Sequence, residues 1–159
     1  MNVLIVYYST TGKTRKIAEK IKEKLSAEVD EIKDIINRNG FLGWLSAGRD
    51  AGSKKLTEIK NVDKNPADYN VVILGSPTWN NSVSTPIRTY IDKYGESLQH
   101  VAIFSTSDGD DQDALKEMEQ MLGKKVFASI HLIRKQEIDS DQYYEKIEKF
   151  VERINSFMR

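Results

Sequence analysis

Residues 3–14 of the chain read Val3-Leu4-Ile5-Val6-Tyr7-Tyr8-Ser9-Thr10-Thr11-Gly12-Lys13-Thr14, and this stretch decides the fold. It opens with a β-branched and aromatic run, typical of a strand buried on both faces. A hydroxyl-rich turn follows, after which apolar residues recur at helical spacing, at Ile17, Ala18, Ile21 and Leu25. The turn therefore lies at a helix N-terminus, where the first N–H groups lack partners and the helix dipole is positive. Four hydroxyl side chains and one glycine at that point predict a phosphate site.

Two better-known phosphate motifs do not match this turn. Gly12-Lys13-Thr14 resembles the end of a P-loop, but that motif requires glycine five residues before the Gly–Lys pair, where this chain has Tyr7. A dinucleotide fingerprint requires three glycines at fixed spacing, and only Gly12 is present. The simplest alternative is a turn that only caps a helix. One cap needs one hydroxyl, so the four hydroxyls favour an anion.

The composition limits the class of protein. The 159 residues carry 24 Lys plus Arg and 24 Asp plus Glu, so the formal net charge is zero, and a length of this order fits one domain, residues 1–159. The lack of a basic excess argues against nucleic acid. The chain has no cysteine, which excludes disulfides, thiolate catalysis and cysteine metal sites. The N-terminal apolar run is too short to span a bilayer and follows no basic leader. We therefore expect a cytoplasmic protein without a nucleic-acid or membrane partner.

Strands and helices alternate along the rest of the chain. Apolar runs predict further strands at 28–33, 71–74, 101–104 and 126–133, the first of which is more polar and should lie near a sheet edge. Apolar stripes at helical spacing predict helices around 87–94, 114–122 and 143–154. This alternation predicts an α/β fold of three layers, in which helices cover both faces of a doubly wound, five-stranded parallel sheet. Ligands of such sheets bind beyond the carboxyl ends of the strands.

The connection from Asp34 to Tyr69 is unusually long. Apolar residues predict a helix inside it, and glycines weaken that prediction. The apolar residues are Phe41, Leu42, Trp44, Leu45 and Ala47, and the glycines are Gly40, Gly43, Gly48 and Gly52. We interpret Trp44 as a core or local packing residue, because it lies on the expected helix stripe.

Two further strand ends carry polar loops, at 75–82 and 105–111. Their strands are expected to be central, so both loops should converge with the hydroxyl-rich turn. Trp79 lies between turn-forming residues, and two readings remain open: a side chain folded onto the core, or a stacking platform for a flat ligand. The aspartates around Gly109 fit a loop that ends at a helix start. A metal site is the alternative, although the calcium pattern of an EF-hand does not match.

The sequence shows no set of catalytic residues and no metal motif. His100 and His131 each lie at or within an expected strand without a paired motif, which favours structural roles. Ser9 is not part of a Gly-x-Ser-x-Gly elbow. This pattern favours a cofactor that carries the chemistry itself.

At this point the residues support a family resemblance. Ser9-Thr10-Thr11-Gly12-Lys13-Thr14 resembles the phosphate loop of the flavodoxins, and Gly75-Ser76-Pro77-Thr78-Trp79 resembles their first flavin-contacting loop. Residues 105–110 fall where the second flavin loop should lie. The resemblance covers essentially the whole chain and looks like the short-chain branch. It implies FMN as cofactor and a flavodoxin-like sheet with the strand order 2-1-3-4-5.

The resemblance also implies which residues hold FMN. The phosphate would be held by Ser9, Thr10, Thr11, Gly12, Lys13 and Thr14, without a need for a counter-cation. The isoalloxazine would be bordered by Ser76, Pro77, Thr78, Trp79, Asn80 and Asn81. Its pyrimidine edge would meet Thr106, Ser107, Asp108 and Gly109.

The chain departs from the flavodoxin pattern in three ways. It is neutral, whereas flavodoxins that serve basic partners are usually acidic. Its second loop lacks the tyrosine that often covers the outer flavin face, so that face is expected to be open. Asn80-Asn81 stands where many flavodoxins have glycine, and asparagine tolerates positive φ less freely. We expect a carbonyl near Asn80 to accept from the reduced flavin and stabilise the neutral semiquinone. The charge of Asp108 should lower the second reduction potential.

Three functions follow in order of preference. The first is an FMN electron carrier that shuttles electrons between redox enzymes through the semiquinone and hydroquinone states, a redox protein rather than a turnover enzyme. The second is an NAD(P)H-dependent FMN reductase of quinones or similar acceptors, for which the 34–69 connection would supply a substrate wall or dimer contact. The third is a flavin-free interaction domain. The identity of any redox partner protein is not encoded in these motifs.

Overall fold

A central sheet organises the molecule. The computed structural model describes residues 1–159 and contains a six-stranded sheet, in which the parallel strands follow the order β2-β1-β3-β5-β6. These strands are β1 (Val3–Tyr7), β2 (Glu28–Glu31), β3 (Val71–Trp79), β5 (His100–Ser107) and β6 (Val126–Ile133). The short β4 (Ser82–Val83) pairs antiparallel with β3 alone. Without β4 the order is the predicted 2-1-3-4-5, and β2 lies at the expected edge.

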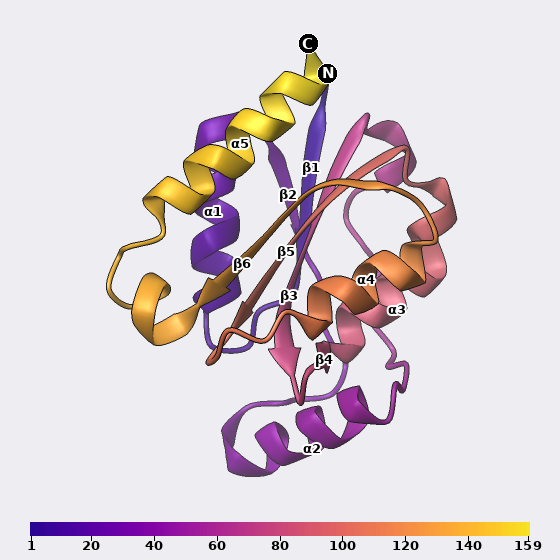
Figure 1. Ribbon diagram of the computed structural model, residues 1–159. Coiled ribbons are helices and arrows are strands. Elements are labelled where there is room, and N and C mark those ends of the chain that lie inside the picture. Colours follow the sequence, from indigo (N-terminus) through magenta and orange to yellow (C-terminus); the bar gives the residue numbers. More distant parts are fainter.

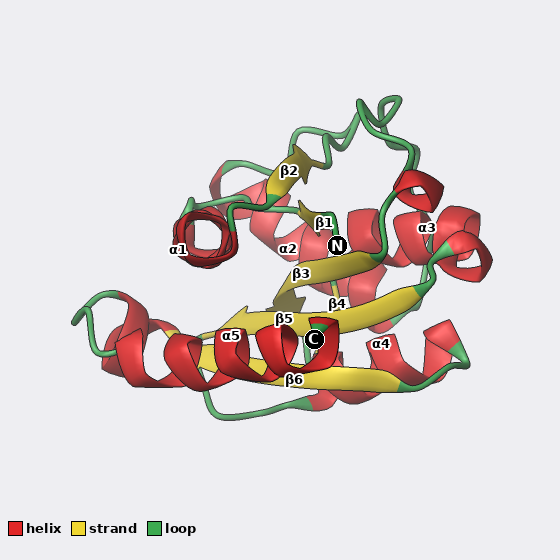
Figure 2. Ribbon diagram, turned by 90° about the horizontal axis from the view of Figure 1, so that it is seen from above, coloured by secondary structure: helices red, strands yellow, loops and turns green.

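Helices cover both faces of the sheet, as Figures 1 and 2 show. One face carries α1 (Lys13–Leu25) and α5 (Tyr144–Met158), and the other carries α3 (Thr85–Tyr94) and α4 (Asp113–Leu122). Successive residues of β1 alternate between the two cores: Ile5 packs with the α1 and α5 side chains, and Leu4 with those of α3 and α4. The predicted three-layer architecture is confirmed.

The remaining elements are short, apart from one helix in the long connection. They are the 3₁₀ turns η1 (Pro66–Asp68) and η2 (Gly95–Ser97), and the π-helical turn η3 (Arg134–Ile138). The connection contains α2 (Gly40–Gly52), which confirms the predicted helix. Figure 1 shows α2 beyond the carboxyl ends of the strands. No helix is long and apolar enough to cross a membrane.

Two strands extend further than their apolar runs predict. β3 continues through Gly75-Ser76-Pro77-Thr78-Trp79, which the sequence analysis places in a loop, and β5 continues to Ser107. The register explains the difference, since Ser76 pairs with Ser105 and Pro77 with Thr106. The buried Ser76 hydroxyl lies 2.9 Å from Ser84 Oγ, so its polarity is satisfied inside the protein. An apolar run in the sequence therefore predicts only the part of a strand that packs against apolar side chains.

Candidate functional site

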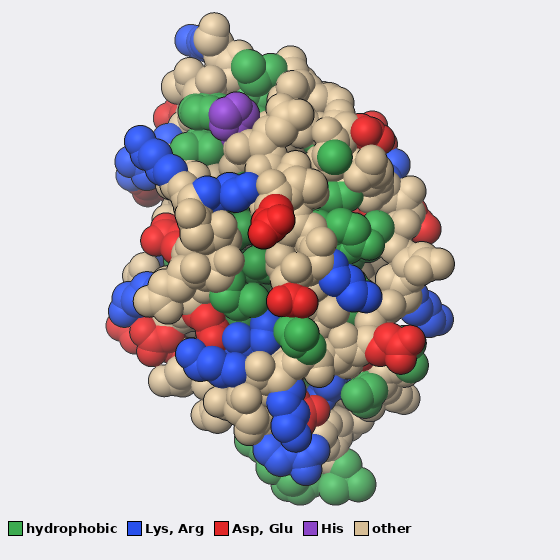
Figure 3. All heavy atoms as spheres, turned by 90° about the vertical axis from the view of Figure 1, so that its right-hand side faces the viewer, with side chains coloured by type: hydrophobic (Ala, Val, Ile, Leu, Met, Phe, Trp, Pro, Cys, Tyr) green, Lys and Arg blue, Asp and Glu red, His purple; other side chains and the backbone are tan.

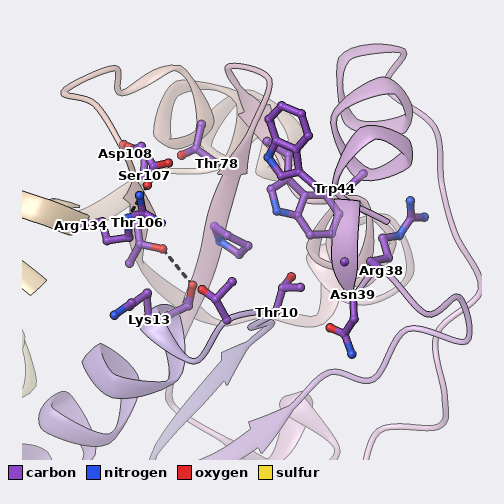
Figure 4. A pocket seen from close by; sticks show the side chains of 16 residues that line it. Thr10, Lys13, Arg38, Asn39, Trp44, Thr78, Thr106, Ser107, Asp108 and Arg134 are labelled. Carbon is purple, nitrogen blue, oxygen red and sulfur yellow. Dashed lines mark hydrogen bonds and ion pairs between the residues drawn. The ribbon is translucent and has the colours of Figure 1, made fainter. Parts of the chain in front are cut away.

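A cavity of about 350 Å³ lies at the carboxyl end of the sheet, a volume typical of small-molecule sites. Ten of the sixteen residues predicted to hold a cofactor line it: Thr10, Thr11, Lys13, Thr14, Pro77, Thr78, Trp79, Thr106, Ser107 and Asp108. Six further lining residues were not predicted: Arg38, Asn39, Gly40, Trp44, Ala47 and Arg134. Figure 4 shows that the three predicted loops converge here. The fold thus brings together segments from both halves of the chain.

The hydroxyl-rich turn has the geometry of an anion site. Gly12 adopts a left-handed φ of 87° just before α1, a conformation that favours glycine. The Gly12 amide donates to Ser9 Oγ at 3.1 Å and the Arg15 amide to the same atom at 3.3 Å, so Ser9 shapes the turn from outside the cavity. The amides of Lys13 and Thr14 have no acceptor in the protein. These free N–H groups at a helix start fit a phosphate.

Hydrogen bonds and ion pairs hold the turn from two sides. Thr14 Oγ1 lies 2.9 Å from Thr106 Oγ1, a buried contact that joins the turn to β5 and is drawn in Figure 4. Lys13 Nζ lies 2.5 Å from Asp139 Oδ1, and this hydrogen bond holds the pKa of the Asp139 carboxyl below its ordinary value. The Lys13 ammonium is therefore already paired, and the backbone amides and hydroxyls are the groups that remain for an anion.

Trp79 forms a fixed wall of the cavity. Its ring meets Tyr8 edge to face at 5.4 Å, and the Arg38 guanidinium lies 5.7 Å from its centre. Trp79 also packs against the core cluster under α3 and α4. The reading of Trp79 as a side chain that packs on the core is confirmed, and the indole also borders the cavity, so stacking on a flat ligand stays a prediction. An aromatic wall held from behind suits a flat ring system.

The neighbours of Trp79 differ in their access to the cavity. Thr78 lines the cavity, and its buried hydroxyl has no hydrogen-bond partner in the protein, which makes it a candidate to bond a ligand. Ser76 is fully buried and already bonded. Asn80 and Asn81 both have positive φ, 47° and 57°, and form the tight turn between β3 and β4 without lining the cavity. This is the left-handed backbone that asparagine tolerates.

The second loop is braced by His131 and Arg134. His131 Nε2 lies 3.0 Å from the Gly109 carbonyl oxygen and 3.1 Å from Ser107 Oγ, while its Nδ1 lies 2.8 Å from Ser105 Oγ. Gly109 therefore faces the histidine rather than the cavity. Arg134 Nε lies 2.9 Å from Asp108 Oδ1, so the charge of Asp108 has a counter-charge on the same cavity wall.

The α2 segment supplies a wall that the sequence analysis did not anticipate. The sequence predicts Trp44 as a core or local packing residue. A core position is wrong, because its side chain is 66% exposed and borders the cavity, as Figure 4 shows, while local packing is confirmed by its stacking on Phe41. The inward face of α2 consists instead of Gly43, Ala47 and Ala51. A Cβ on Gly43 would stand 2.3 Å from the backbone carbonyl carbon of Arg38, so only glycine lets α2 lie this close to the Arg38 backbone. This glycine therefore supports the position of the helix.

Arg38 anchors this wall and was also missed. Its Nε donates to Asp34 Oδ2 at 2.8 Å and its Nη1 to Asp50 Oδ2 at 2.9 Å, with all three side chains largely buried. The hydrogen bond from Arg38 holds the pKa of the Asp50 carboxyl below its ordinary value. One arginine thus fixes the beginning of the connection, α2 and Trp79. The sequence signal is weak, because Asp34, Arg38 and Asp50 are ordinary charged residues and no local pattern marks them as partners.

The cavity fits the cofactor that the resemblance implies. The amides of Lys13 and Thr14 suit its phosphate, Trp79 suits its ring, and the unpaired Thr78 hydroxyl suits a polar atom along its length. The polar groups are few and the aromatic wall is fixed, which is the usual composition of a small-molecule site.

Comparisons with known proteins agree with this geometry. A flavoprotein from Lactobacillus acidophilus, solved in complex with FMN, is 26% identical, with a TM-score of 0.72 over 92% of this chain and 98% of that one. A Bacteroides eggerthii protein described as a flavoprotein is 20% identical over 92% and 96%, with a TM-score of 0.68. Oxidised flavodoxin 1 from Bacillus cereus shares the fold at 15% identity, with a TM-score of 0.55 over 98% of both chains. The family model described as flavodoxin matches residues 2–154, and the chain therefore belongs to the flavodoxin family.

Proposed function

We propose that this protein binds FMN in the cavity at the carboxyl end of the sheet and transfers electrons between redox partners. One observation carries the proposal: the turn with free Lys13 and Thr14 amides and the fixed wall of Trp79 border the same cavity. Membership of the flavodoxin family and the FMN complex of the Lactobacillus acidophilus relative support it. The flavin supplies the redox chemistry when bound.

The residues of the chain have separate tasks in this proposal. The amides of Lys13 and Thr14 bind the phosphate, Trp79 orients the ring, and Thr78 offers a hydroxyl beside it. His131 and Arg134 hold the loop of residues 107–109 in place. α2 excludes water from one side through Trp44 and Ala47.

The test is reconstitution of the apoprotein with FMN and, separately, with riboflavin, which lacks the phosphate. We expect one FMN per chain and much weaker riboflavin binding. In Gly12→Ala a side chain is forced into a left-handed backbone, which costs roughly 1–2 kcal/mol. The turn of the apoprotein can shift to relieve this strain, whereas bound FMN requires the original turn, so FMN affinity should fall by up to about tenfold. The matched control is Gly109→Ala, where an added Cβ meets nothing within 4 Å. Equal binding of FMN and riboflavin would reject the phosphate assignment.

A reductase of quinones or similar acceptors that uses NAD(P)H is the second candidate. α2 favours it, since the long connection places Trp44 and Ala47 on the cavity, as a substrate wall would require. Stepwise reduction separates the two functions. Rapid bleaching of the FMN-loaded protein by NAD(P)H, followed by reoxidation with a quinone, supports the reductase. A stable one-electron-reduced form and slow NAD(P)H oxidation support the carrier.

The redox partner proteins and the cytoplasmic location of this protein stay predictions from the sequence.

A further inference from the structure

Helix α2 and the residues that flank it expose an unusual number of large apolar side chains. Ten large hydrophobic side chains of the protein are exposed, and seven belong to the segment 35–56: Ile35, Ile36, Phe41, Leu42, Trp44, Leu45 and Leu56. Phe41 and Leu42 are 72% and 79% exposed. Figure 3 shows hydrophobic side chains gathered at the lower end of the molecule, where Figure 1 places α2. Such a concentration on a surface otherwise polar indicates an interaction site.

This apolar face belongs to an anchored helix. Gly43, Ala47 and Ala51 are buried against the body of the protein, and the Arg38–Asp34–Asp50 cluster fixes both the approach to α2 and its second half. Phe41 and Trp44 stack with ring centres 6.1 Å apart on the free side. The fold therefore holds these apolar side chains on the surface, and no other part of the chain covers them.

Exposed cations outnumber exposed anions in the segment that carries the apolar face. Within residues 33–60 the exposed charged side chains comprise five cations and one anion: Lys33, Arg49, Lys54, Lys55 and Lys60, against Glu58. Asp34 and Asp50 pair with the largely buried Arg38, and Asp50 Oδ1 also lies 3.3 Å from Arg49 and 3.7 Å from Lys55. Lys54 pairs with Glu117 at 3.5 Å, and Lys33 and Lys60 have no acidic partner. The whole chain is neutral, so this end is cationic and the remainder is correspondingly acidic. Figure 3 shows Lys and Arg side chains next to the lower hydrophobic group.

We propose that α2 and its basic surround dock onto the surface of an anionic lipid bilayer. Apolar and aromatic side chains that enter the headgroup region, with lysine and arginine beside them, provide the two signals that reversible membrane binding requires. A second copy fits less well. In a two-fold contact this face would meet itself, and the five exposed cations would oppose those of the other copy.

The geometry also sets the orientation on the bilayer. Trp44 and Ala47 border the cavity, so docking through α2 turns the cavity towards the lipid. The sequence predicts no membrane partner because no segment can span a bilayer, and the absence of a spanning helix leaves surface attachment open. The helix lies on the membrane rather than across it.

Vesicle co-sedimentation of the full chain tests the proposal, with and without FMN. Vesicles of phosphatidylcholine mixed with phosphatidylglycerol should bind the protein, phosphatidylcholine alone should bind it weakly, and added salt should release it. Phe41→Ser with Leu42→Ser should lower the partition coefficient about tenfold or more, because both apolar anchors are lost. Arg49→Glu with Lys55→Glu should weaken binding to the anionic vesicles alone. Phe41 and Leu42 are exposed, so their replacement should change the thermal midpoint little. Arg49 and Lys55 lie 3.3 and 3.7 Å from Asp50, so the midpoint of the charge-reversal variant is measured and its vesicle binding is compared well below that temperature.

Matched controls lie away from α2. Tyr144→Ser removes an exposed aromatic side chain of α5, and Lys125→Glu reverses an exposed charge at the amino end of β6. Neither should change the partition coefficient. Absence of vesicle binding at low salt would overturn the proposal, as would equal binding of the Phe41→Ser, Leu42→Ser protein. Sedimentation as a dimer that this double variant abolishes would assign the face to a second copy instead. FMN stoichiometry is measured separately, so a failure here leaves the proposed function standing.

Discussion

At the scale of single residues, a polar group that is hydrogen-bonded within the protein has a structural role, whereas a polar group without a partner is available for a ligand. Ser76 and Thr78 are neighbours on β3 with similar side chains. The Ser76 hydroxyl bonds within the protein, whereas the Thr78 hydroxyl has no partner and borders the cavity. The sequence places both in the same candidate loop. Only the positions of their neighbours show which hydroxyl is available for a ligand.

Replacing these two hydroxyls should have opposite effects. Thr78→Val removes an unpaired group at constant shape, so the free energy of unfolding of the apoprotein should stay within about 1 kcal/mol, while FMN affinity falls about fivefold to tenfold. Ser76→Ala leaves the Ser84 amide without its acceptor and should cost about 1–3 kcal/mol. Urea unfolding and a fluorescence titration with FMN measure both. Unchanged FMN affinity in Thr78→Val would show that the hydroxyl does not contact the cofactor.

The Asp108–Arg134 pair modifies the electrostatic prediction made from the sequence. Asp108 alone should disfavour a negatively charged flavin, but Arg134 lies 2.9 Å away and offsets much of that charge. We expect Asp108→Asn to raise the potential of the second electron slightly and Arg134→Gln to lower it. In the Arg134→Gln background, Asp108→Asn should raise this potential by a larger amount, equivalent to an energy on the order of a kcal/mol at low salt. Potentiometric titration of all four proteins tests this coupling, and identical steps in both backgrounds would refute it.

At the scale of elements, α2 depends on one arginine. Arg38→Met leaves the buried Asp34 carboxylate without its counter-charge and Asp50 with only the exposed Arg49 and Lys55, which should destabilise the protein by about 3–5 kcal/mol. Hydrogen exchange across residues 40–52 should accelerate. Arg38→Lys should rescue little, because one ammonium cannot reproduce the forked geometry. The control is Arg49→Gln, an exposed change expected to stay within about 0.5 kcal/mol. Equal unfolding midpoints for Arg38→Met and wild type would contradict the anchoring role.

Two exposed ion pairs join the start of α1 to the segment that precedes α5. Lys13 bonds to Asp139 and Lys16 to Asp141, and each hydrogen bond lowers the pKa of its carboxyl. Lowered pKa values mean that these pairs contribute stability above the ordinary aspartate pKa of about 3.9 and lose it as the pH falls through the lowered values.

Carboxyl NMR titration of the apoprotein checks this linkage. Lys13→Met should return the Asp139 midpoint towards its ordinary value, and Lys16→Met should do the same for Asp141. Lys93→Met, which changes an exposed residue of α3, should shift neither midpoint. An Asp139 midpoint that does not move in Lys13→Met would show that the pair does not form in solution.

At the scale of the whole molecule, the central strands leave no spare room. A Cβ on Gly75 would stand 2.1 Å from the ring of Phe104, the residue paired with it on β5 and itself fully buried. The resemblance identifies Gly75 only as part of a flavin loop. The structure shows that it also makes space for a core aromatic ring beneath the site.

Gly75→Ala should therefore destabilise the protein by about 1–3 kcal/mol through overpacking. Phe104→Leu in the same chain should recover part of that loss, which a double-mutant cycle by urea unfolding measures. Gly95→Ala is the control, since its nearest atom would lie at an ordinary 3.4 Å. Additive losses for Gly75→Ala and Phe104→Leu would show that the two residues do not compete for space.

The sequence by itself determined the strand–turn–helix at residues 3–25, the parallel sheet and an anion site at the turn. Those properties depend on local periodicity and on backbone groups that every helix start exposes. The strand order and the cofactor came from the resemblance of the loops to the flavodoxins. The tertiary structure alone decided that Trp44 faces the cavity, that Arg38 joins α2 to Trp79, and that Arg134 offsets Asp108. These contacts join residues from different elements, and no local pattern in the sequence specifies which distant side chains meet. Short loop motifs therefore indicate the class of cofactor, whereas the α2 wall of the cavity is determined by how distant parts of the chain pack.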